Sequence, residues 1–238
     1  MIIRSAIVII VSIMVSSCGA DSSSETKGAG AEDSLTEEVV VSADDQVGTA
    51  EPVVAQIYIG NNAELLNELE TSRVFVINSI QNLTPQQWKH SEHESRWSIA
   101  EITEHLVSAE RLFLMLIDSY VIQGTENETR AQSVNQTDKE VIEFISNRAN
   151  SFAAPSQLQP AGVFDSVEQG VSAFKRERAL TLAYLQNTTV NLRGFAQVFP
   201  GMDVKPMDAH QWFIYICGHT SRHLEQISQV KAHYKYPF

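Results

Sequence analysis

Three histidines, in two segments of the chain, have the residue type and the spacing of a metal site. His219 and His223 are four residues apart, and His105 lies in a separate segment much earlier in the chain. On a helix, residues four apart share one face, about one turn from each other. A second helix carrying His105 would bring a third imidazole to the same ion and leave a coordination position for water or substrate. This ligand set is more typical of a reactive metal site than of a structural one.

Polar side chains beside these histidines can tune such a site. Along residues 215–226, four side chains follow one helical line at spacings of four, four and three: Tyr215, His219, His223 and Gln226. The Gln226 amide can hydrogen-bond a ligand histidine and fix its tautomer. Tyr215 either packs in the core or donates a proton. Arg222 either pairs with an acid or orients an anionic substrate.

Glu101 lies one turn before His105 and completes a Ser-x-x-Glu pattern with Ser98. The pattern predicts a capping box at the start of a helix, and the alternative is that Glu101 accepts a proton in catalysis. Glu101 and Tyr215 are the side-chain candidates for catalysis beside a metal-activated water. We expect Glu110, further along the same helix, at the surface or in an ion pair.

The other histidines and the cysteine carry weaker signals. His90 and His93 lie in a polar stretch that favours exposure to solvent, His210 lies a turn or more before the histidine pair, and His233 lies beyond it. Cys217 precedes the pair by two residues and points ~200° away around the helix. We therefore expect Cys217 to be a buried, inert thiol.

Four long helices are expected to position these side chains. Apolar residues at helical spacing predict helices that start at Asn61 or Asn62, at Ser98, at about Val167 and near Pro206, the first three ending near residues 82, 122 and 187. A shorter helix is predicted over 138–150, with connectors over 85–97 and 187–205. No repeat and no β alternation is evident. The sequence predicts an all-α fold, a four-helix bundle with long crossover connections.

The apolar positions indicate what the bundle buries. In the third long helix, the residues expected to face mostly inward are Val171, Phe174, Leu180, Leu182 and Leu185. The three tryptophans are expected to close the core near the helix ends: Trp88, Trp97 and Trp212.

The two histidine segments also resemble a known family. Residues 97–110, with Trp97-Ser98, Glu101, His105-Leu106 and Glu110, match the W-S-x-x-E-x-x-x-H-L-x-x-x-E segment of the DinB/YfiT-like superfamily. Residues 219–227 match its C-terminal H-x-x-R-H-x-x-Q-I segment. The likeness spans roughly residues 60–238, which is the whole part expected to fold.

The resemblance implies a four-helix bundle in which His105, His219 and His223 bind a divalent metal, zinc or nickel among those that family members hold. Members of this family include metal-dependent thiol S-transferases that use small thiols, and some relatives act as hydrolases or isomerases. A small-molecule substrate follows from this, and a homodimer is compatible with it because family members often dimerise.

Three functions are therefore open at this point. The first is a metal-dependent enzyme, either thiol S-transferase-like or hydrolase-like. The second is a non-catalytic module, tethered to a membrane, that binds a metal or a ligand without turnover. The third treats the histidines as a structural clip between helices, which would require a fourth protein ligand, and the sequence offers no strong candidate.

Residues 1–17 have the features of an export signal, with Arg4 followed by an apolar stretch over 6–15. That stretch is shorter than the ~20 apolar residues of a transmembrane helix. Residues 15–18, Val-Ser-Ser-Cys, resemble the lipobox of bacterial lipoproteins, which implies cleavage before Cys18 and its lipidation; a simple secretory signal is the alternative. A lipid would anchor the protein to a membrane. Because Gly19 follows the cysteine, we expect a cell-envelope location, in the outer membrane and facing the periplasm.

Residues 18–57 are predicted to be a disordered acidic tether. They contain nine acidic residues and one lysine, and they lack an amphipathic period. The whole chain has a net charge of −12, so much of its acidity belongs to this segment. No basic face points to a nucleic-acid partner. Residues 58–238 are long enough for one domain with a sizeable core.

Overall fold

The computed structural model describes residues 61–123, 134–150, 153–197 and 204–237, and these are mostly helical. The long helices are α1 (Asn62–Ile80), α3 (Ile99–Gln123), α6 (Val167–Asn187) and α7 (Ala209–Ala232). The shorter elements are α2 (Pro85–Trp88), α5 (Asp138–Ser146), the 3-10 turns η1 (Ser156–Leu158) and η2 (Leu192–Gly194), and the strands β1 (Ala196–Gln197) and β2 (Met207–Asp208). The predicted export signal and tether lie outside the described residues.

Polar side chains cap the first residues of the helices where the sequence predicts them. Asn61 accepts hydrogen bonds from the backbone N–H groups of Ala63 and Glu64 before α1. At the start of α3, the backbone N–H of Ser98 donates to Glu101 Oε2 at 2.7 Å, and the N–H of Glu101 donates to Ser98 Oγ at 3.3 Å. This reciprocal pair confirms the predicted capping box.

Helix α7 begins three residues later than predicted from Pro206. Met207 and Asp208 form β2, which pairs antiparallel with β1, so the chain is still extended at these positions. The carboxylate of Asp208 then accepts a hydrogen bond from the backbone N–H of Gln211 at 2.7 Å and caps the helix. The start of α7 therefore depends on a strand pair and a cap that the apolar pattern does not contain.

Three further predictions about local structure need correction. The connector over 85–97 contains the short helix α2, which begins with Pro85 and is capped by Thr84. Helix α5 ends at Ser146 because Asn147 adopts an extended backbone conformation. In α6, Leu180 was expected to face inward but its exposed fraction is 52%, whereas Arg178 is fully buried.

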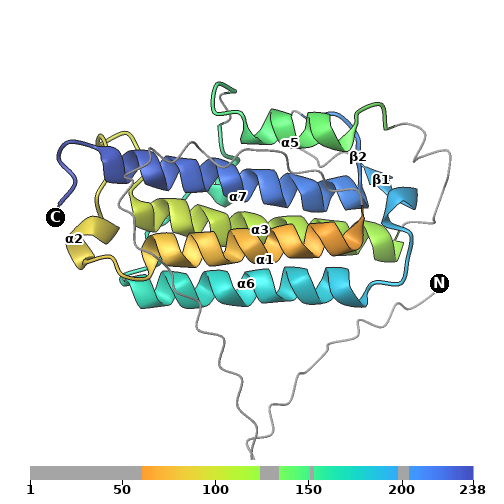
Figure 1. Ribbon diagram of the computed structural model, residues 1–238, viewed down its shortest axis with the longest axis horizontal. Helices are drawn as coiled ribbons and strands as arrows, with labels where there is room; N and C mark the ends of the chain where they lie inside the picture. The colour runs from red at the N-terminus through yellow and green to blue at the C-terminus, as the bar shows by residue number, and fades with distance from the viewer. Residues whose placement is uncertain (1–60, 124–133, 151–152, 198–203, 238) are drawn as a thin grey trace, which may run out of the picture. The chain divides into compact units, whose positions relative to one another are not determined.

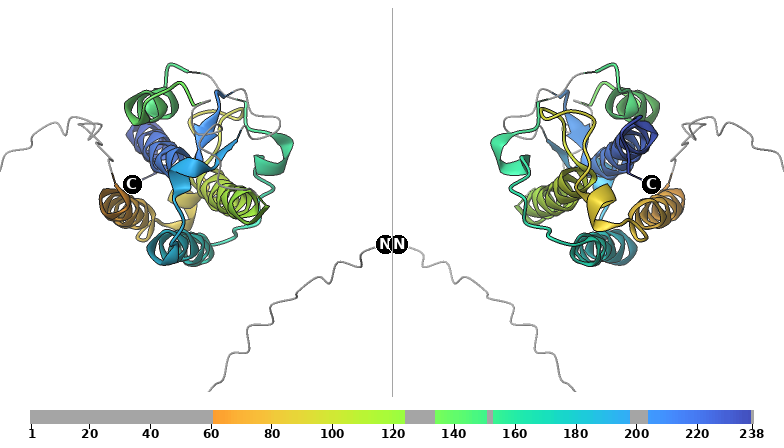
Figure 2. Two further views of the ribbon diagram at one scale, coloured as in Figure 1. Left: turned by 90° about the vertical axis from the view of Figure 1, so that its right-hand side faces the viewer. Right: turned by 90° about the vertical axis from the view of Figure 1, so that its left-hand side faces the viewer.

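The four long helices form a bundle in which α1 packs against α6 and α7, and α3 packs against the same two helices (Figure 2). Figure 1 shows that α3 and α6 run in one direction while α1 and α7 run in the other. Because the neighbours α3 and α6 are parallel, the chain must return along the bundle between them, and α5 and η1 lie on that connection. The predicted four-helix bundle with long crossover connections is confirmed. Within the described residues, none of the helices combines the length and the apolar character that crossing a membrane requires.

A buried ion pair joins all four bundle helices. Arg178 on α6 donates to Glu110 Oε1 on α3 at 2.5 Å, and the exposed fractions of the two side chains are 0% and 3%. The same guanidinium donates to the carbonyl of Leu69 and to Ser72 Oγ on α1, both at 2.7 Å, and to Thr220 Oγ1 on α7 at 2.8 Å. Glu110 is thus in the ion pair that the sequence allowed, and it is buried.

Candidate metal centre

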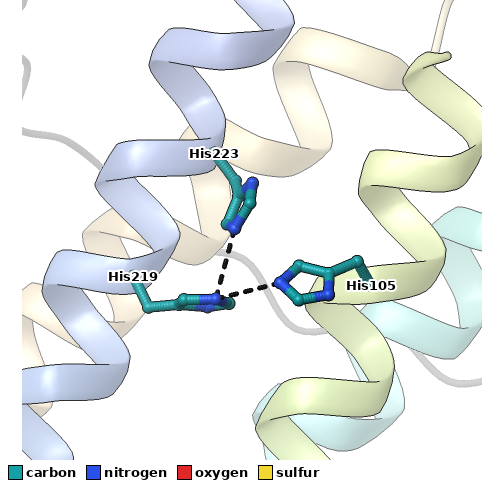
Figure 3. A group of neighbouring side chains, drawn as sticks. All are labelled: His105, His219 and His223. Atoms are coloured by element: carbon teal, nitrogen blue, oxygen red, sulfur yellow. Dashed lines mark hydrogen bonds between the residues drawn. The ribbon is translucent and has the colours of Figure 1, made fainter. Parts of the chain in front are cut away.

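The structure brings the three predicted histidines together between α3 and α7 (Figure 3). The Nε2 atom of His219 lies 3.1 Å from the Nε2 atom of His105 and 3.2 Å from that of His223. One ring nitrogen from each residue lies within 4.8 Å of the others. Ligand nitrogens around a tetrahedral zinc ion, with bonds of ~2.0–2.1 Å, are about 3.3–3.4 Å apart. The three imidazoles therefore have the spacing of a group that can hold a divalent metal ion.

Helix packing explains this convergence. His219 and His223 lie one turn apart on the same face of α7, and α3 packs beside that face in the opposite direction. His105 lies on the second turn of α3, whose first turn is fixed by the Ser98 cap. Among the described residues, His105, His219 and His223 form the one group of three or more His, Cys, Asp or Glu side chains with metal-binding spacing. A closed structural clip with a fourth protein ligand is thus not found in that part of the chain.

Burial keeps the three imidazoles neutral. Their exposed fractions are 4% for His105, 9% for His219 and 6% for His223. Burial lowers the pKa of His105, and burial followed by the proximity of the other rings lowers the pKa of His219 and His223 well below the ordinary value. Neutral imidazole is the form that offers a nitrogen lone pair to a metal.

Two of the rings are oriented by hydrogen bonds from their second nitrogen. The Nδ1 atom of His105 donates to the carbonyl oxygen of Leu158 at 2.8 Å, and the Nδ1 atom of His223 donates to Gln226 Oε1 at 2.8 Å. A proton on Nδ1 leaves the Nε2 lone pair free to point at the centre of the group. Gln226 thus hydrogen-bonds one of the three candidate histidines, and its role at a metal stays a prediction.

Aromatic rings enclose the histidines. The ring centroid of Trp97 lies 4.8 Å from that of His105 and 6.4 Å from that of His223. On His219, the ring of Phe113 packs edge-on at 5.7 Å and the ring of Tyr215 stacks at 6.3 Å. These apolar walls restrict access of water to the centre.

A cleft of about 510 Å³ is lined in part by Trp97, whose ring also packs against His105. Its lining includes Trp97, Glu104, Gly162, Phe164, Lys89 and Arg96. Trp97 therefore belongs both to the cleft and to the wall of the histidine group.

The weaker catalytic candidates occupy structural positions. Glu101 caps α3 through its bonds to Ser98. Tyr215 is buried against Phe113 and Trp212, and burial raises the pKa of its hydroxyl above the ordinary value. The positions of these two side chains therefore do not indicate a role in proton transfer.

The other polar candidates also differ in their surroundings. Arg222 donates to the backbone carbonyls of Asn147 and Asn150, both at 2.6 Å, and so links α7 to the end of α5. Cys217 is fully buried, and burial raises the pKa of its thiol, as expected for an inert cysteine. Among the remaining histidines, His90 contacts His233 through ring nitrogens 3.2 Å apart, and His93 is exposed.

Sequence reasoning missed three contributors to the site. Trp97 was expected to close the core, and Trp88 and Trp212 do so, but Trp97 is partly exposed and lies against the histidines. The carbonyl of Leu158 leaves no side-chain signal. The buried carboxylate of Glu104, next to His105, accepts hydrogen bonds from the backbone N–H groups of residues 161–163. Because the donors are backbone groups, their residue types give no signal in the sequence.

Comparisons with known proteins show the family and the fold of the chain. The model of the DinB superfamily matches residues 42–227 of the chain. The uncharacterized protein YuaE of Bacillus subtilis (strain 168) is 25% identical over 162 residues, which are 67% of this chain and 93% of YuaE. In structure, the chain is similar to YfiT from Bacillus subtilis, with a TM-score of 0.51 and 10% sequence identity over 80% of this chain and 97% of YfiT. YfiT is described as a probable metal-dependent hydrolase with an unusual four-helix bundle topology.

Proposed function

Because the chain belongs to the DinB superfamily, we propose that it is a divalent-metal-dependent enzyme that acts on a small molecule, with His105, His219 and His223 as the metal ligands. The observation that carries this proposal is the convergence of three neutral, buried imidazoles on one point. Zinc or nickel is the expected ion, because imidazole nitrogen suits both.

The donor set determines which chemistry fits. A divalent ion held by three neutral imidazoles supplies Lewis-acid activation of a water or a thiol. His105 and His223 contribute Nε2 lone pairs whose direction is set by Leu158 and Gln226. The rings of Trp97, Phe113 and Tyr215 exclude bulk water from the point where the nitrogens meet.

Hydrolysis is the reaction that we favour, and transfer of a small thiol is the alternative. Of the acidic side chains near the histidines, Glu101 is bonded to Ser98 and Glu104 to the backbone of a loop, so the activation of a water would come from the ion that the three histidines would hold. The description of YfiT as a probable metal-dependent hydrolase supports the same choice. The cleft beside Trp97 is the proposed route for the substrate, since it has room for a small molecule.

The test begins with metal content. Full-length protein is purified without chelators, and its metal is measured by elemental analysis next to that of His219→Ala and of the control His93→Ala, which changes an exposed histidine. We expect about one equivalent of metal in the wild type and the control, and loss of that metal in His219→Ala. Equal metal content in all three proteins would overturn the proposed site.

Turnover then separates the functions. The metal-loaded protein is offered esters and amides in one set and a small thiol with an electrophile in another. Hydrolysis that disappears in His219→Ala supports the proposal, and thiol transfer supports the alternative. Metal binding without turnover, together with a tight ligand in a thermal-shift screen, would indicate a non-catalytic binding module.

We also propose that the chain is exported and anchored in the cell envelope through a lipid on Cys18, because residues 15–18 resemble a lipobox. Mass spectrometry of the mature N-terminal peptide tests this. A lipid-modified Cys18 is the expected result, and an intact N-terminus or cleavage elsewhere would contradict it.

A further inference from the structure

Glu104, the residue before His105 on α3, is a buried carboxylate that holds a loop. Its exposed fraction is 5%. Its Oε1 atom accepts a hydrogen bond from the N–H of Ala161 at 2.7 Å, and its Oε2 atom accepts bonds from the N–H groups of Gly162 and Val163 at 2.9 and 3.0 Å. Three consecutive backbone N–H groups thus surround one carboxylate, an arrangement in which backbone dipoles compensate a negative charge.

The loop bends at Gly162 to make this contact. Gly162 has a φ of 76°, in the left-handed region that side chains disfavour. A Cβ atom added there would find no heavy atom within 4 Å, so the requirement for glycine comes from the backbone and not from crowding.

The same loop supplies the hydrogen-bond acceptor of His105. Leu158, three residues before Ala161, offers the carbonyl oxygen that accepts the Nδ1 proton of His105 at 2.8 Å. Neighbouring residues of α3 therefore hold the two ends of one short segment, residues 158–163. His105 holds the first end, and Glu104 holds the second with three bonds.

We propose that Glu104 is a positioning residue for the metal site, which keeps the Leu158 carbonyl against His105 and so keeps the His105 proton on Nδ1. The part of this inference that concerns metal binding rests on the proposed function. Without the three bonds to Glu104, the Leu158 carbonyl would lose its preference for one position, because an unheld backbone regains conformational entropy. His105 would then divide its proton between both nitrogens, and its Nε2 lone pair would be available only part of the time.

The first measurement needs no metal. In metal-free, full-length protein, nitrogen-15 NMR of the histidine rings reports which nitrogen of His105 carries the proton. The variant is Glu104→Gln, whose side chain has nearly the same size but offers one acceptor oxygen and places an NH₂ group against a backbone N–H. We expect the wild type to hold the Nδ1–H tautomer and the variant to show a mixture of both tautomers.

A second variant perturbs the loop without touching the carboxylate. Gly162→Ala forces a side chain into the left-handed region, and Gly162→Asn tolerates that region better. We expect Gly162→Ala to shift the His105 tautomer in the same direction as Glu104→Gln, and Gly162→Asn to stay nearer to the wild type. The matched control is Glu140→Gln, which removes a carboxylate that also accepts a backbone N–H, in the capping box of α5.

Metal affinity is the second measurement, by competition with a chromogenic chelator. A partner of a ligand histidine typically contributes 10–100-fold to metal affinity, and for Glu104→Gln we expect a loss of about tenfold. The control Glu140→Gln should keep the wild-type affinity even if its thermal stability falls.

The outcomes separate this inference from the proposed function. Absence of metal binding by the wild type would overturn the proposed function, while the tautomer of His105 in the metal-free proteins would still decide the role of Glu104. If Glu104→Gln and Gly162→Ala both keep the Nδ1–H tautomer of the wild type, Glu104 serves the loop alone and the inference is wrong. If Glu104→Gln does not fold, the comparison of Gly162→Ala with Gly162→Asn decides the question.

Discussion

The Nδ1 atom of His223 donates to the Oε1 atom of Gln226, one turn further along α7, at 2.8 Å. Both residues belong to one helix, on which positions three apart are neighbours, so the contact is local to α7. An amide oxygen can only accept a hydrogen bond. In this arrangement the proton of His223 lies on Nδ1, and its Nε2 atom, 3.2 Å from Nε2 of His219, keeps its lone pair.

Replacement of Gln226 by leucine is expected to weaken metal binding. Without the amide oxygen, His223 loses its orienting partner, and affinity should fall by about 10–100-fold. Competition with a chelator measures the change. The control is Gln229→Leu, a glutamine on the exposed side of the same helix, which should bind metal as the wild type does. Equal affinities of the two variants would contradict the role of Gln226.

Removal of Arg178 is expected to cost much of the stability of the bundle. Arg178→Met leaves the buried carboxylate of Glu110 without its partner, and breaking a buried ion pair in this way costs about 3–5 kcal/mol. The double variant Arg178→Met, Glu110→Leu removes both charges and should be more stable than the single variant. Urea unfolding of the three proteins gives the comparison, and a double variant less stable than Arg178→Met would contradict it.

A methyl group at Gly218 is expected to disturb the packing of α5 on α7. A Cβ atom there would lie 2.3 Å from Cγ2 of Ile145 and 3.0 Å from Cδ1 of Ile142. Because Cγ2 is bonded directly to the stiff branched carbon of Ile145, relief requires movement of α5. We expect Gly218→Ala to lower the free energy of unfolding by about 1–3 kcal/mol, the usual cost of overpacking.

Truncation of Ile145 provides the matched test of this clash. In the presence of Gly218→Ala, the change Ile145→Ala should cost less than it does in the wild type, with a coupling of about 0.5–3 kcal/mol in urea unfolding. Simple additivity of the two changes would show that α5 accommodates the methyl group without strain.

His210 is expected to make the stability of the protein sensitive to acid. In the described part of the chain, neither ring nitrogen of His210 has a hydrogen-bond partner. Burial, and then the nearby guanidinium of Arg193, lowers the pKa of His210 to about 4. In the unfolded chain, a histidine has a pKa of about 6.5. At pH values between these two pKa values, His210 binds a proton in the unfolded state and not in the folded state. The free energy of unfolding therefore falls as the pH falls from about 6.5 to about 4.

The variant His210→Leu isolates this effect. One proton corresponds to a slope of at most about 1.4 kcal/mol per pH unit, and the variant should have a shallower slope than the wild type over that range. At pH 8 it should be at least as stable, because an apolar side chain replaces an unpaired polar one. Urea unfolding at several pH values measures both quantities, and parallel pH profiles would contradict the prediction.

Local signals explain what the sequence could predict. Helix caps and histidine spacing act within one or two turns of a helix. Their structural consequences can therefore be predicted from residues close in sequence, as for Asn61, Ser98 and the pair His219 and His223. The family motif added the position of His105, which spacing alone could not connect to the pair.

Features that depend on distant partners were missed for a physical reason. Arginine is a mostly exposed residue type, and Arg178 on α6 is buried because the other three bundle helices supply its acceptors. The start of α7 at Ala209 depends on the pairing of β2 with β1. The Glu104 carboxylate bonds to backbone N–H groups, and Leu158 contributes its backbone carbonyl. Because every residue carries these backbone groups, the residue types give no signal of such contacts.

The single guanidinium that touches every bundle helix has a consequence for how such proteins can diverge. Arg178 ties the frame together through contacts that lie within the four long helices. The cleft, by contrast, is lined mainly by residues from the connections between helices. Insertions and exchanges in those connections can reshape what the protein accepts while the frame and its histidines keep their places. Natural variation among related bundles should therefore concentrate around the cleft, and new specificities could be selected there in the laboratory.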